Sequence, residues 1–191
     1  MFRKAFMKKY SFGFLIVGLL VLLGCQRDDL CPGSTNTTPL LIIRFYDFEA
    51  PDEPTPPQNL SIAEIPETET DSLSWATYVD DEGNTVTLRR RSQDSIAIPL
   101  RTDQNLTRFY FILDTEIDEN GFVTSGNADT LTFSYDLQEE YLNRACSFQR
   151  KFINLKVNRT AEEDGQNWIR EINIEENNVE DENQAHVSIY F

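Results

Sequence analysis

Short segments rich in β-forming residues, separated by turn residues, follow one another along most of this chain. Valine, isoleucine, threonine, phenylalanine and tyrosine dominate them, and in several segments apolar side chains alternate with polar ones, as in strands with one buried face. Turn motifs occur at D-D-E-G (80–83), D-E-N-G (118–121) and E-E-D-G (162–165), and we expect a hairpin at each. The predicted strands cover residues 40–46, 59–65, 72–79, 84–90, 95–100, 107–117, 129–135, 152–157, 167–174 and 185–191.

This pattern predicts an all-β protein, because no strand–helix–strand rhythm is present. Short strands at hairpin spacing favour an antiparallel β-sandwich of the immunoglobulin-like kind, with a small β-barrel as the alternative. One helical competitor is found at residues 136–145, where Leu137, Tyr141 and Ala145 recur every four residues. Such a helix would have at most a few turns.

Residues 40–46 form an apolar run on both faces and predict a central strand that is covered on two sides. Arg44 lies within this run. We expect it to have an acidic or carbonyl partner, because burying a lone charge is costly. The proline-rich segment 49–58 cannot lie inside a sheet and is expected to be an exposed loop.

The first 24 residues predict a cleaved signal peptide. They contain four basic residues and no acid, followed by an apolar run that is too short for a transmembrane helix of ~20 residues. The run ends in Leu22-Leu23-Gly24-Cys25, which resembles the lipobox of bacterial lipoproteins. By that resemblance, cleavage precedes Cys25 and this cysteine carries the acyl chains. An uncleaved membrane anchor is the alternative.

The predicted organisation is a signal peptide (1–24), a lipidated polar tether (25–38) and one β-sandwich domain (39–191). Removing the signal peptide leaves 167 residues and changes the net charge from −15 to −19, because the peptide contains four bases and no acid. Such a surface repels nucleic acid and anionic headgroups. We therefore expect no nucleic-acid partner, and we expect membrane attachment through the lipid rather than through a basic face.

With Cys25 assigned to the lipid, Cys31 and Cys146 remain. An even pair of cysteines in an oxidising compartment predicts a disulfide between them, and two free thiols are the alternative.

The residues that directly follow Cys25 are Gln26, Arg27, Asp28 and Asp29. They resemble the surface-export signal of Bacteroidota lipoproteins, and two acids beside an anionic leaflet keep such a peptide away from the membrane. An ordinary acidic tether that faces the periplasm is the alternative.

The sequence offers little catalytic chemistry. The single histidine, His186, shares the polar side of the alternating strand 185–191, so we expect it to face solvent and to be dispensable. One histidine and two paired cysteines predict neither a metal site of usual composition nor a His-dependent nucleophile, and no cofactor is expected. A calcium-loop pattern at 116–127 lacks the final glutamate, whereas a looser calcium site between the acidic turns 80–82 and 162–164 stays open.

Two features suit binding. Trp75 with Tyr78, or Tyr110 with Tyr190, would form an aromatic platform for a sugar or a protein, unless they pack in the core. The basic run 89–91 would hold an anion, unless it pairs with nearby acids.

The combination of the lipobox with several segments of the domain resembles a family of Bacteroidota envelope lipoproteins of unknown function. That resemblance implies a single domain with no assigned activity and no catalytic residue to carry over. We expect an outer-membrane-anchored lipoprotein, on the cell surface rather than the periplasmic face, that acts as a non-enzymatic module binding an envelope protein or a glycan. A carbohydrate-binding or glycan-processing lipoprotein is the alternative. The segments are Cys31-Pro32, TPLLIIRFYD (38–47), DSIAIPL (94–100), the aromatic strand 107–117, DTLTFSY (129–135), RACSF (144–148) and HVSIYF (186–191).

Overall fold

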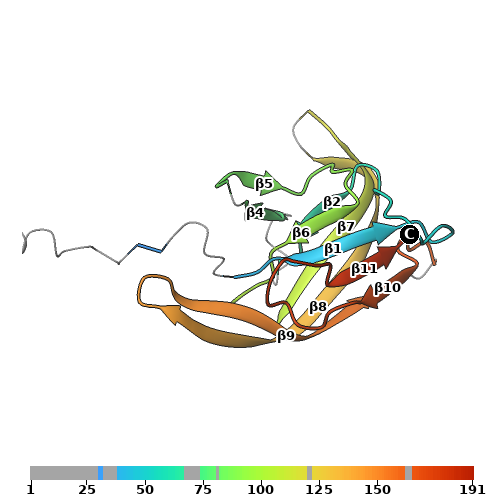
Figure 1. Ribbon diagram of the computed structural model, residues 1–191. Coiled ribbons are helices and arrows are strands. Elements are labelled where there is room, and N and C mark those ends of the chain that lie inside the picture. The colour runs from blue at the N-terminus through green and yellow to red at the C-terminus, as the bar shows by residue number, and fades with distance from the viewer. Residues whose placement is uncertain (1–29, 32–37, 67–73, 81, 120–121, 162–164) are drawn as a thin grey trace, which may run out of the picture.

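Strands joined by turns and irregular loops make up the described part of the chain in the computed structural model, and this part contains no helix (Figure 1). The structure describes residues 30–31, 38–66, 74–80, 82–119, 122–161 and 165–191. Within these ranges no helix is long and apolar enough to span a membrane. The strands are β1 (Leu41–Tyr46), β2 (Ser61–Glu64), β3 (Ser74–Trp75), β4 (Thr77–Val79), β5 (Thr85–Thr87), β6 (Ser95–Ile98), β7 (Leu106–Ile117), β8 (Val123–Asn143), β9 (Ser147–Arg159), β10 (Glu171–Ile174) and β11 (Val187–Tyr190).

The smaller of the two main sheets has four strands in the order β10-β11-β1-β6. β1 lies in its interior, as the apolar run predicts. It runs antiparallel to β6, with Leu41 opposite Ile98, and parallel to β11, with Ile43 opposite Val187. The sheet therefore joins the first strand of the domain directly to the last.

The larger sheet has five antiparallel strands in the order β3-β2-β7-β8-β9. β8 is 21 residues long and pairs with β7 along its first part and with β9 along its second. A separate ribbon, β4–β5, is closed by the predicted D-D-E-G turn, in which the Gly83 N–H donates to the Asp80 carbonyl oxygen at 2.9 Å.

The hydrophobic core lies between the two sheets. Alternate residues of β1 point into it, so that Leu41, Ile43 and Phe45 are completely buried. Neither sheet closes on itself, which confirms the sandwich and not the barrel. The largest side chains of this core are Phe45, Phe109, Phe111, Phe133, Phe152, Leu41, Ile43, Leu60, Ile62, Ile98, Leu131 and Ile169.

Arg44 differs from the expectation for residues 40–46. Its side chain is exposed, while Ile42 and Tyr46 on the same face are only partly buried. This face of β1 therefore borders solvent at Arg44, and the charge does not need a buried partner.

The helix considered for residues 136–145 is wrong. This segment belongs to β8, where Leu137 pairs with Phe152 and Tyr141 pairs with Phe148 across the strands. A spacing of four residues also places side chains on one face of a strand, so the pattern fits both structures. Backbone pairing with β9 favours the strand.

The hairpin expected around E-E-D-G (162–165) is also wrong. β9 belongs to the five-stranded sheet, whereas β10 pairs with β11 in the four-stranded one. The connection crosses from one sheet to the other. It is fixed by Trp168, whose indole N–H donates to the Phe111 carbonyl oxygen at 3.0 Å, and by Asp129, whose carboxylate accepts the Ile169 N–H at 2.8 Å.

Candidate functional site

A cleft of about 550 Å³ lies beside the β4–β5 ribbon. The ribbon lies next to the edge strand β6 (Figure 1), and the cleft reaches from the ribbon across the end of β6 to the start of β1. The residues that line it come from segments far apart in the sequence: Thr38, Pro39, Leu40, Tyr78, Val79, Asp80, Glu82, Ala97, Pro99, Leu100, Thr102 and Glu182.

Two carboxylates at the cleft are held by hydrogen bonds. Asp80 Oδ1 accepts the Asn84 N–H at 2.7 Å, and Oδ2 accepts from the Asn84 side-chain amide at 3.2 Å. These bonds lower the pKa of Asp80 and keep it ionised. Glu182 Oε1 accepts the Leu40 N–H at 2.9 Å, which ties the loop before β11 to the start of β1. Both side chains are thus held in position by hydrogen bonds.

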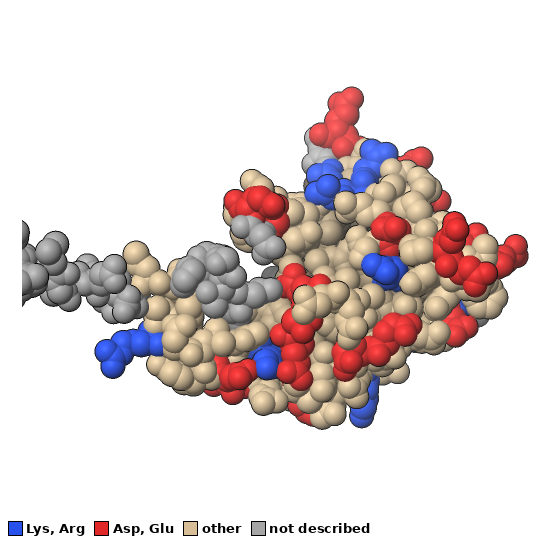
Figure 2. Space-filling model, in the orientation of Figure 1, with Lys and Arg blue, Asp and Glu red and all other residues tan. Residues whose placement is uncertain are grey.

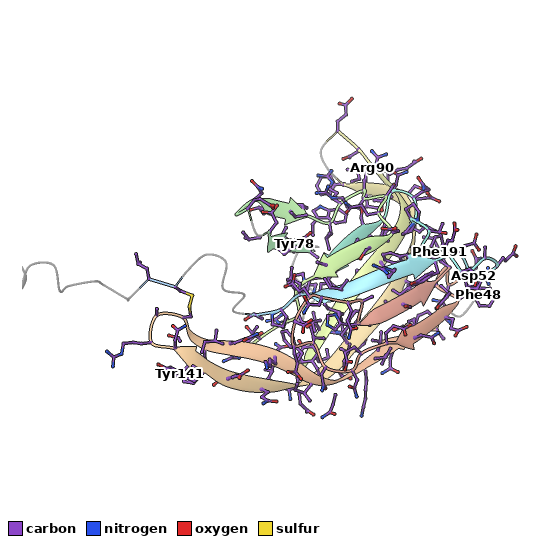
Figure 3. The ribbon with its side chains drawn as sticks, viewed as in Figure 1. Phe48, Asp52, Tyr78, Arg90, Tyr141 and Phe191 are labelled. Carbon is purple, nitrogen blue, oxygen red and sulfur yellow. A yellow bond between two sulfur atoms is a disulfide. The ribbon has the colours of Figure 1, made fainter. Side chains whose placement is uncertain are left out.

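Tyr78 is the aromatic residue of the cleft. It comes from β4, is half-buried and packs against the core (Figure 3). Burial raises its pKa, an effect that the positive charge of Arg91 partly offsets. The phenol therefore stays protonated at neutral pH and can donate a hydrogen bond.

The walls of the cleft combine apolar surface with negative charge. Prolines, leucines and Tyr78 supply the apolar part, and among the described lining residues there is no lysine, arginine or histidine. A ligand that fits this chemistry presents a flat apolar face together with hydrogen-bond donors or a positive charge.

The aromatic pairs considered from the sequence do not form platforms. Trp75 lies in β3 with the Arg89 guanidinium 5.7 Å from its ring centre, and it does not line the cleft with Tyr78. Tyr110 is in the five-stranded sheet. Tyr190 is in the other sheet, where it stacks on Tyr46 at 5.2 Å between ring centres.

The basic run 89–91 is divided among different contacts. Arg89 lies over Trp75, and Arg91 Nε donates to the Thr87 carbonyl oxygen at 3.0 Å. The backbone at Arg90 has a φ of 49°, and its N–H donates to Ser61 Oγ at 2.8 Å. The run therefore forms a structural turn beside β2.

His186 is not solvent-facing, which corrects the expectation from the alternating pattern. It is buried with 1% of its surface exposed, and its Nδ1 accepts the Ile42 N–H at 3.0 Å. Burial lowers its pKa, although the Asp181 carbonyl and nearby acids oppose this change. The segment between β10 and β11 covers the face that the sequence pattern marks as polar, so His186 is a structural residue.

No group of three or more His, Cys, Asp or Glu side chains is placed to bind a metal ion in the described part of the chain. Of the acidic turns considered for calcium, Asp81 and residues 162–164 lie outside the described residues. In the 116–127 segment, Asp118 Oδ1 accepts the Phe122 N–H at 2.8 Å, so this carboxylate stabilises the turn between β7 and β8.

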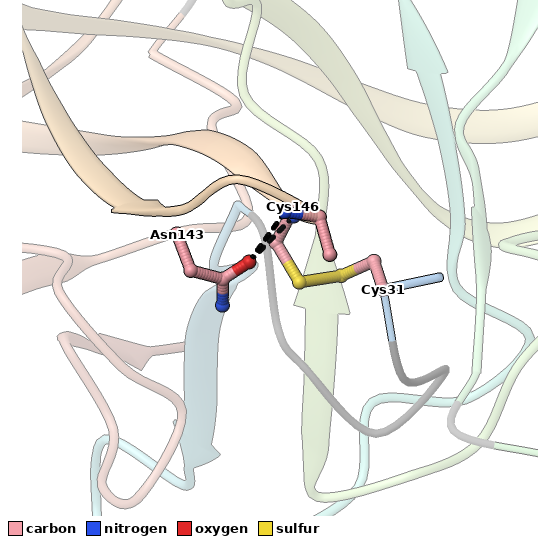
Figure 4. Close-up of a disulfide and its surroundings, with 4 residues drawn as sticks. Cys31, Asn143 and Cys146 are labelled. Atoms are coloured by element: carbon pink, nitrogen blue, oxygen red, sulfur yellow. Dashed lines mark hydrogen bonds between the residues drawn. A yellow bond between two sulfur atoms is a disulfide. The ribbon is translucent and has the colours of Figure 1, made fainter. Parts of the chain in front are cut away.

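The predicted disulfide between Cys31 and Cys146 is present, with the two Cα atoms 4.7 Å apart (Figure 4). Cys146 lies in the turn between β8 and β9. Asn143 Oδ1 accepts the N–H groups of Ala145 and Cys146 there, at 2.9 and 2.8 Å. Cys25 and the expected export signal, residues 26–29, lie outside the described residues.

Comparisons with curated proteins and with solved structures give no match. A family model described as "Family of unknown function (DUF6452)" matches residues 73–191, which include the cleft residues of the β4–β5 ribbon, Cys146 and the whole of β6 to β11. The chain therefore belongs to this family of unknown function.

Proposed function

We propose that this protein is a lipoprotein of the outer membrane, anchored through Cys25 and displayed on the cell surface, whose β-sandwich is a non-enzymatic binding or interaction module. The Cys31–Cys146 disulfide is the observation that carries the proposal, because structural disulfides form in oxidising compartments such as the bacterial envelope. Pairing of these two cysteines leaves Cys25, which ends the lipobox-like sequence, as the third.

The cleft supports a binding role. Its carboxylates at Asp80 and Glu182 already accept hydrogen bonds from the fold, and the Asp80 pKa is lowered. A general acid or base needs a pKa near the working pH, so Asp80 suits a fixed negative rim rather than proton transfer. Tyr78 and its apolar neighbours supply the surface that a ligand would cover.

A carbohydrate ligand is the second candidate, and Tyr78 favours it. A tyrosine ring beside carboxylates offers a stacking face for a sugar ring and acceptors for its hydroxyl groups. In this version the protein binds glycans at the cell surface through the cleft.

The anchoring part is tested by mass spectrometry of the mature N-terminus. We expect a first peptide that begins at an acylated Cys25, and Cys25→Ser should abolish both processing and membrane association. A mature protein that retains residues 1–24, or that starts elsewhere without lipid, would contradict the proposal.

Surface display is tested by protease treatment of intact cells. The wild type should be cleaved without permeabilisation, and Asp28→Ala/Asp29→Ala should be protected. Protection of both proteins would place the domain on the periplasmic side. Equal cleavage of both would show display that does not depend on Asp28 and Asp29.

The carbohydrate version is tested on a glycan array with the purified domain. Tyr78→Ala should lose binding, whereas Tyr110→Ala, a tyrosine of the five-stranded sheet outside the cleft, should retain it. Retention of binding by Tyr78→Ala, or no binding by the wild type, would argue against a glycan in this cleft.

A further inference from the structure

The far ends of β8 and β9 form a two-stranded arm, residues 137–151, that extends beyond the four-stranded sheet (Figure 1). The turn at its end contains Cys146, which is bonded to Cys31. The arm and Cys31 lie at one end of the molecule, while Phe48 and Phe191 lie at the other (Figure 3). The end of the arm is therefore the part of the sandwich that is covalently closest to the predicted lipid anchor.

The end of the arm carries exposed apolar side chains. Tyr141 and Phe148 are opposite each other on the two strands, pack edge to face with ring centres 5.4 Å apart, and are 59% and 57% exposed. They lie on the face that Leu137 and Phe152 turn toward the core, because strand side chains repeat every two residues. Between these two aromatic residues and the core, the same face carries the ion pair of Glu139 and Arg150, so Tyr141 and Phe148 form a separate exposed apolar patch at the end of the arm. Leu30, next to Cys31 in the chain, is 84% exposed.

The charge of the arm differs from that of the rest of the chain. Residues 137–151 contain three bases and two acids, a net charge of +1, whereas the whole chain has −15. Glu139 and Glu140 are neutralised by ion pairs with Arg150 and Lys151, and Arg144 is exposed in the end turn. Figure 2 shows this end as largely uncharged surface with a projecting basic side chain, while acidic residues are spread over the body of the domain. A membrane surface with anionic lipids would repel the acidic body of the domain but not the arm, whose net charge is slightly positive.

The length of the connection limits how far this surface can lie from the membrane. Cys31 lies six positions after Cys25, and a fully extended chain of that length spans at most about 20 Å. Without the disulfide, the first contact with the domain would come near Thr38, just before β1, which lies 13 positions after Cys25 and at most about 45 Å from it along an extended chain. The disulfide roughly halves the reach, and it does so at the end of the arm that carries the exposed Tyr141 and Phe148.

From these observations we propose that the end of the β8–β9 arm, with Tyr141, Phe148 and Leu30, contacts the lipid surface in which Cys25 is anchored. The inference rests on the proposed lipid anchor. A tyrosine at the headgroup level buries its ring while its hydroxyl stays in water, and phenylalanine and leucine beside it bury further apolar surface. The contact orients the sandwich so that the opposite end, with Phe48 and Phe191, points away from the membrane.

The test uses the full-length, processed protein in phospholipid vesicles, with tryptophan as the reporter. Phe148→Trp places a reporter in the arm. Phe122→Trp is the matched control, because Phe122 is 71% exposed just before the other end of β8. Vesicles with and without lipids brominated on their acyl chains are compared, since bromine quenches tryptophan only at close approach. The emission of the wild-type protein, which comes from Trp75 and Trp168, is subtracted from that of each variant.

We expect bromolipids to quench the added emission of Phe148→Trp and to leave that of Phe122→Trp unchanged. Equal emission with and without bromolipid for Phe148→Trp would overturn the inference, and so would a blue shift without quenching, because it would show burial against protein rather than lipid. Protein that does not float with the vesicles at all would instead contradict the lipid anchor. A vesicle-bound protein with an unquenched Phe148→Trp would contradict only the arm contact.

Discussion

His186 Nδ1 accepts the N–H of Ile42 at 3.0 Å, and the His186 N–H donates to the Ile42 carbonyl oxygen at 2.9 Å. One residue at the start of β11 thereby satisfies both backbone groups of a residue in β1. The parallel pairing of the first and last strands begins at this point, where Ile43 lies opposite Val187. These two hydrogen bonds of His186 thus connect the first strand of the domain to the last.

We predict that His186→Ala destabilises the domain by about 1–3 kcal/mol, the usual cost of leaving a buried backbone donor without a partner. His186→Asn should cost less, because the asparagine Oδ1 is attached at the same position as the histidine Nδ1 and can accept the Ile42 N–H. Urea denaturation of the three proteins measures the difference. Equal stability of wild type and His186→Ala would show that water replaces the bond.

Stability should also depend on pH through His186. Burial lowers its pKa in the folded state, so below the unfolded value of about 6.5 the unfolded chain binds more protons than the folded one. The folded state therefore loses stability as the pH falls from about 6.5 toward the folded pKa. Asp181, Glu176 and Glu182 lie nearby and reduce the effect. Melting curves between pH 7 and pH 5 should show a steeper loss for the wild type than for His186→Asn; parallel curves would contradict the prediction.

Asp129 should be among the least replaceable residues of the chain. It is fully buried in β8, where its carboxylate accepts the Ile169 N–H and, at 2.9 Å, the side-chain amide of Asn167. We expect Asp129→Ala to cost about 3 kcal/mol or more, because two buried donors lose this acceptor, at a cost of ~1–3 kcal/mol each. Thermal or chemical unfolding checks this, with the exposed Asp52→Ala as the control that should change little.

Removal of the disulfide should lower the free energy of unfolding by up to about 4–5 kcal/mol, because the loop that it closes spans 115 residues. Cys31→Ser is the preferred variant, since Cys146 is buried and its replacement would also affect packing. Denaturation of both proteins gives the difference. Mass spectrometry of unreduced wild type must show the linked peptides, and two thiols that alkylate without reductant would refute the pairing.

Gly126 should not tolerate alanine. Its φ is +145°, and a Cβ there would lie 2.6 Å from Ile112 Cγ2 and 3.0 Å from the Leu113 carbonyl oxygen. We expect Gly126→Ala to cost about 1–3 kcal/mol through crowding and backbone strain. Gly83→Ala is the control for strain alone, because Gly83 also has a positive φ but no atom within 4 Å of an added Cβ. Equal losses of stability in the two variants would show that the contacts with Ile112 and Leu113 add nothing to the cost of the strained backbone.

The sequence predicts well the features that depend on neighbouring residues. The D-D-E-G turn closes β4–β5, and the turn near 118–121 joins β7 to β8, because turn chemistry is local. The cysteine pair is also predicted, from the number of cysteines and the oxidising compartment that the signal sequence leads us to expect. The E-E-D-G motif does not form a hairpin, because β10 after it pairs with β11, and β11 in turn pairs with the distant strand β1 of the other sheet.

The features that the sequence does not predict depend on which distant segments of the chain come into contact. An alternating pattern identifies one buried face of a strand, but the second face at His186 is covered by the segment before β11, which carries no periodic signal. The cleft is likewise formed by residues 38–40, 78–82, 97–102 and Glu182, and no local motif connects them. The spacing of four residues in 136–145 fits a helix and a strand equally well, and only the pairing with β9 decides for the strand.

The placement of β1 between β6 and β11 has a consequence for how the chain acquires its structure. β1 is the first strand of the domain, and its parallel partner is the last, so a chain that emerges from its N-terminus cannot complete the four-stranded sheet until residues 187–190 are available. Folds dominated by such distant pairings fold slowly, because the loop entropy is lost before the contacts form. The four-stranded sheet is therefore completed only once the last strand is available, and until then one edge of β1 has no partner.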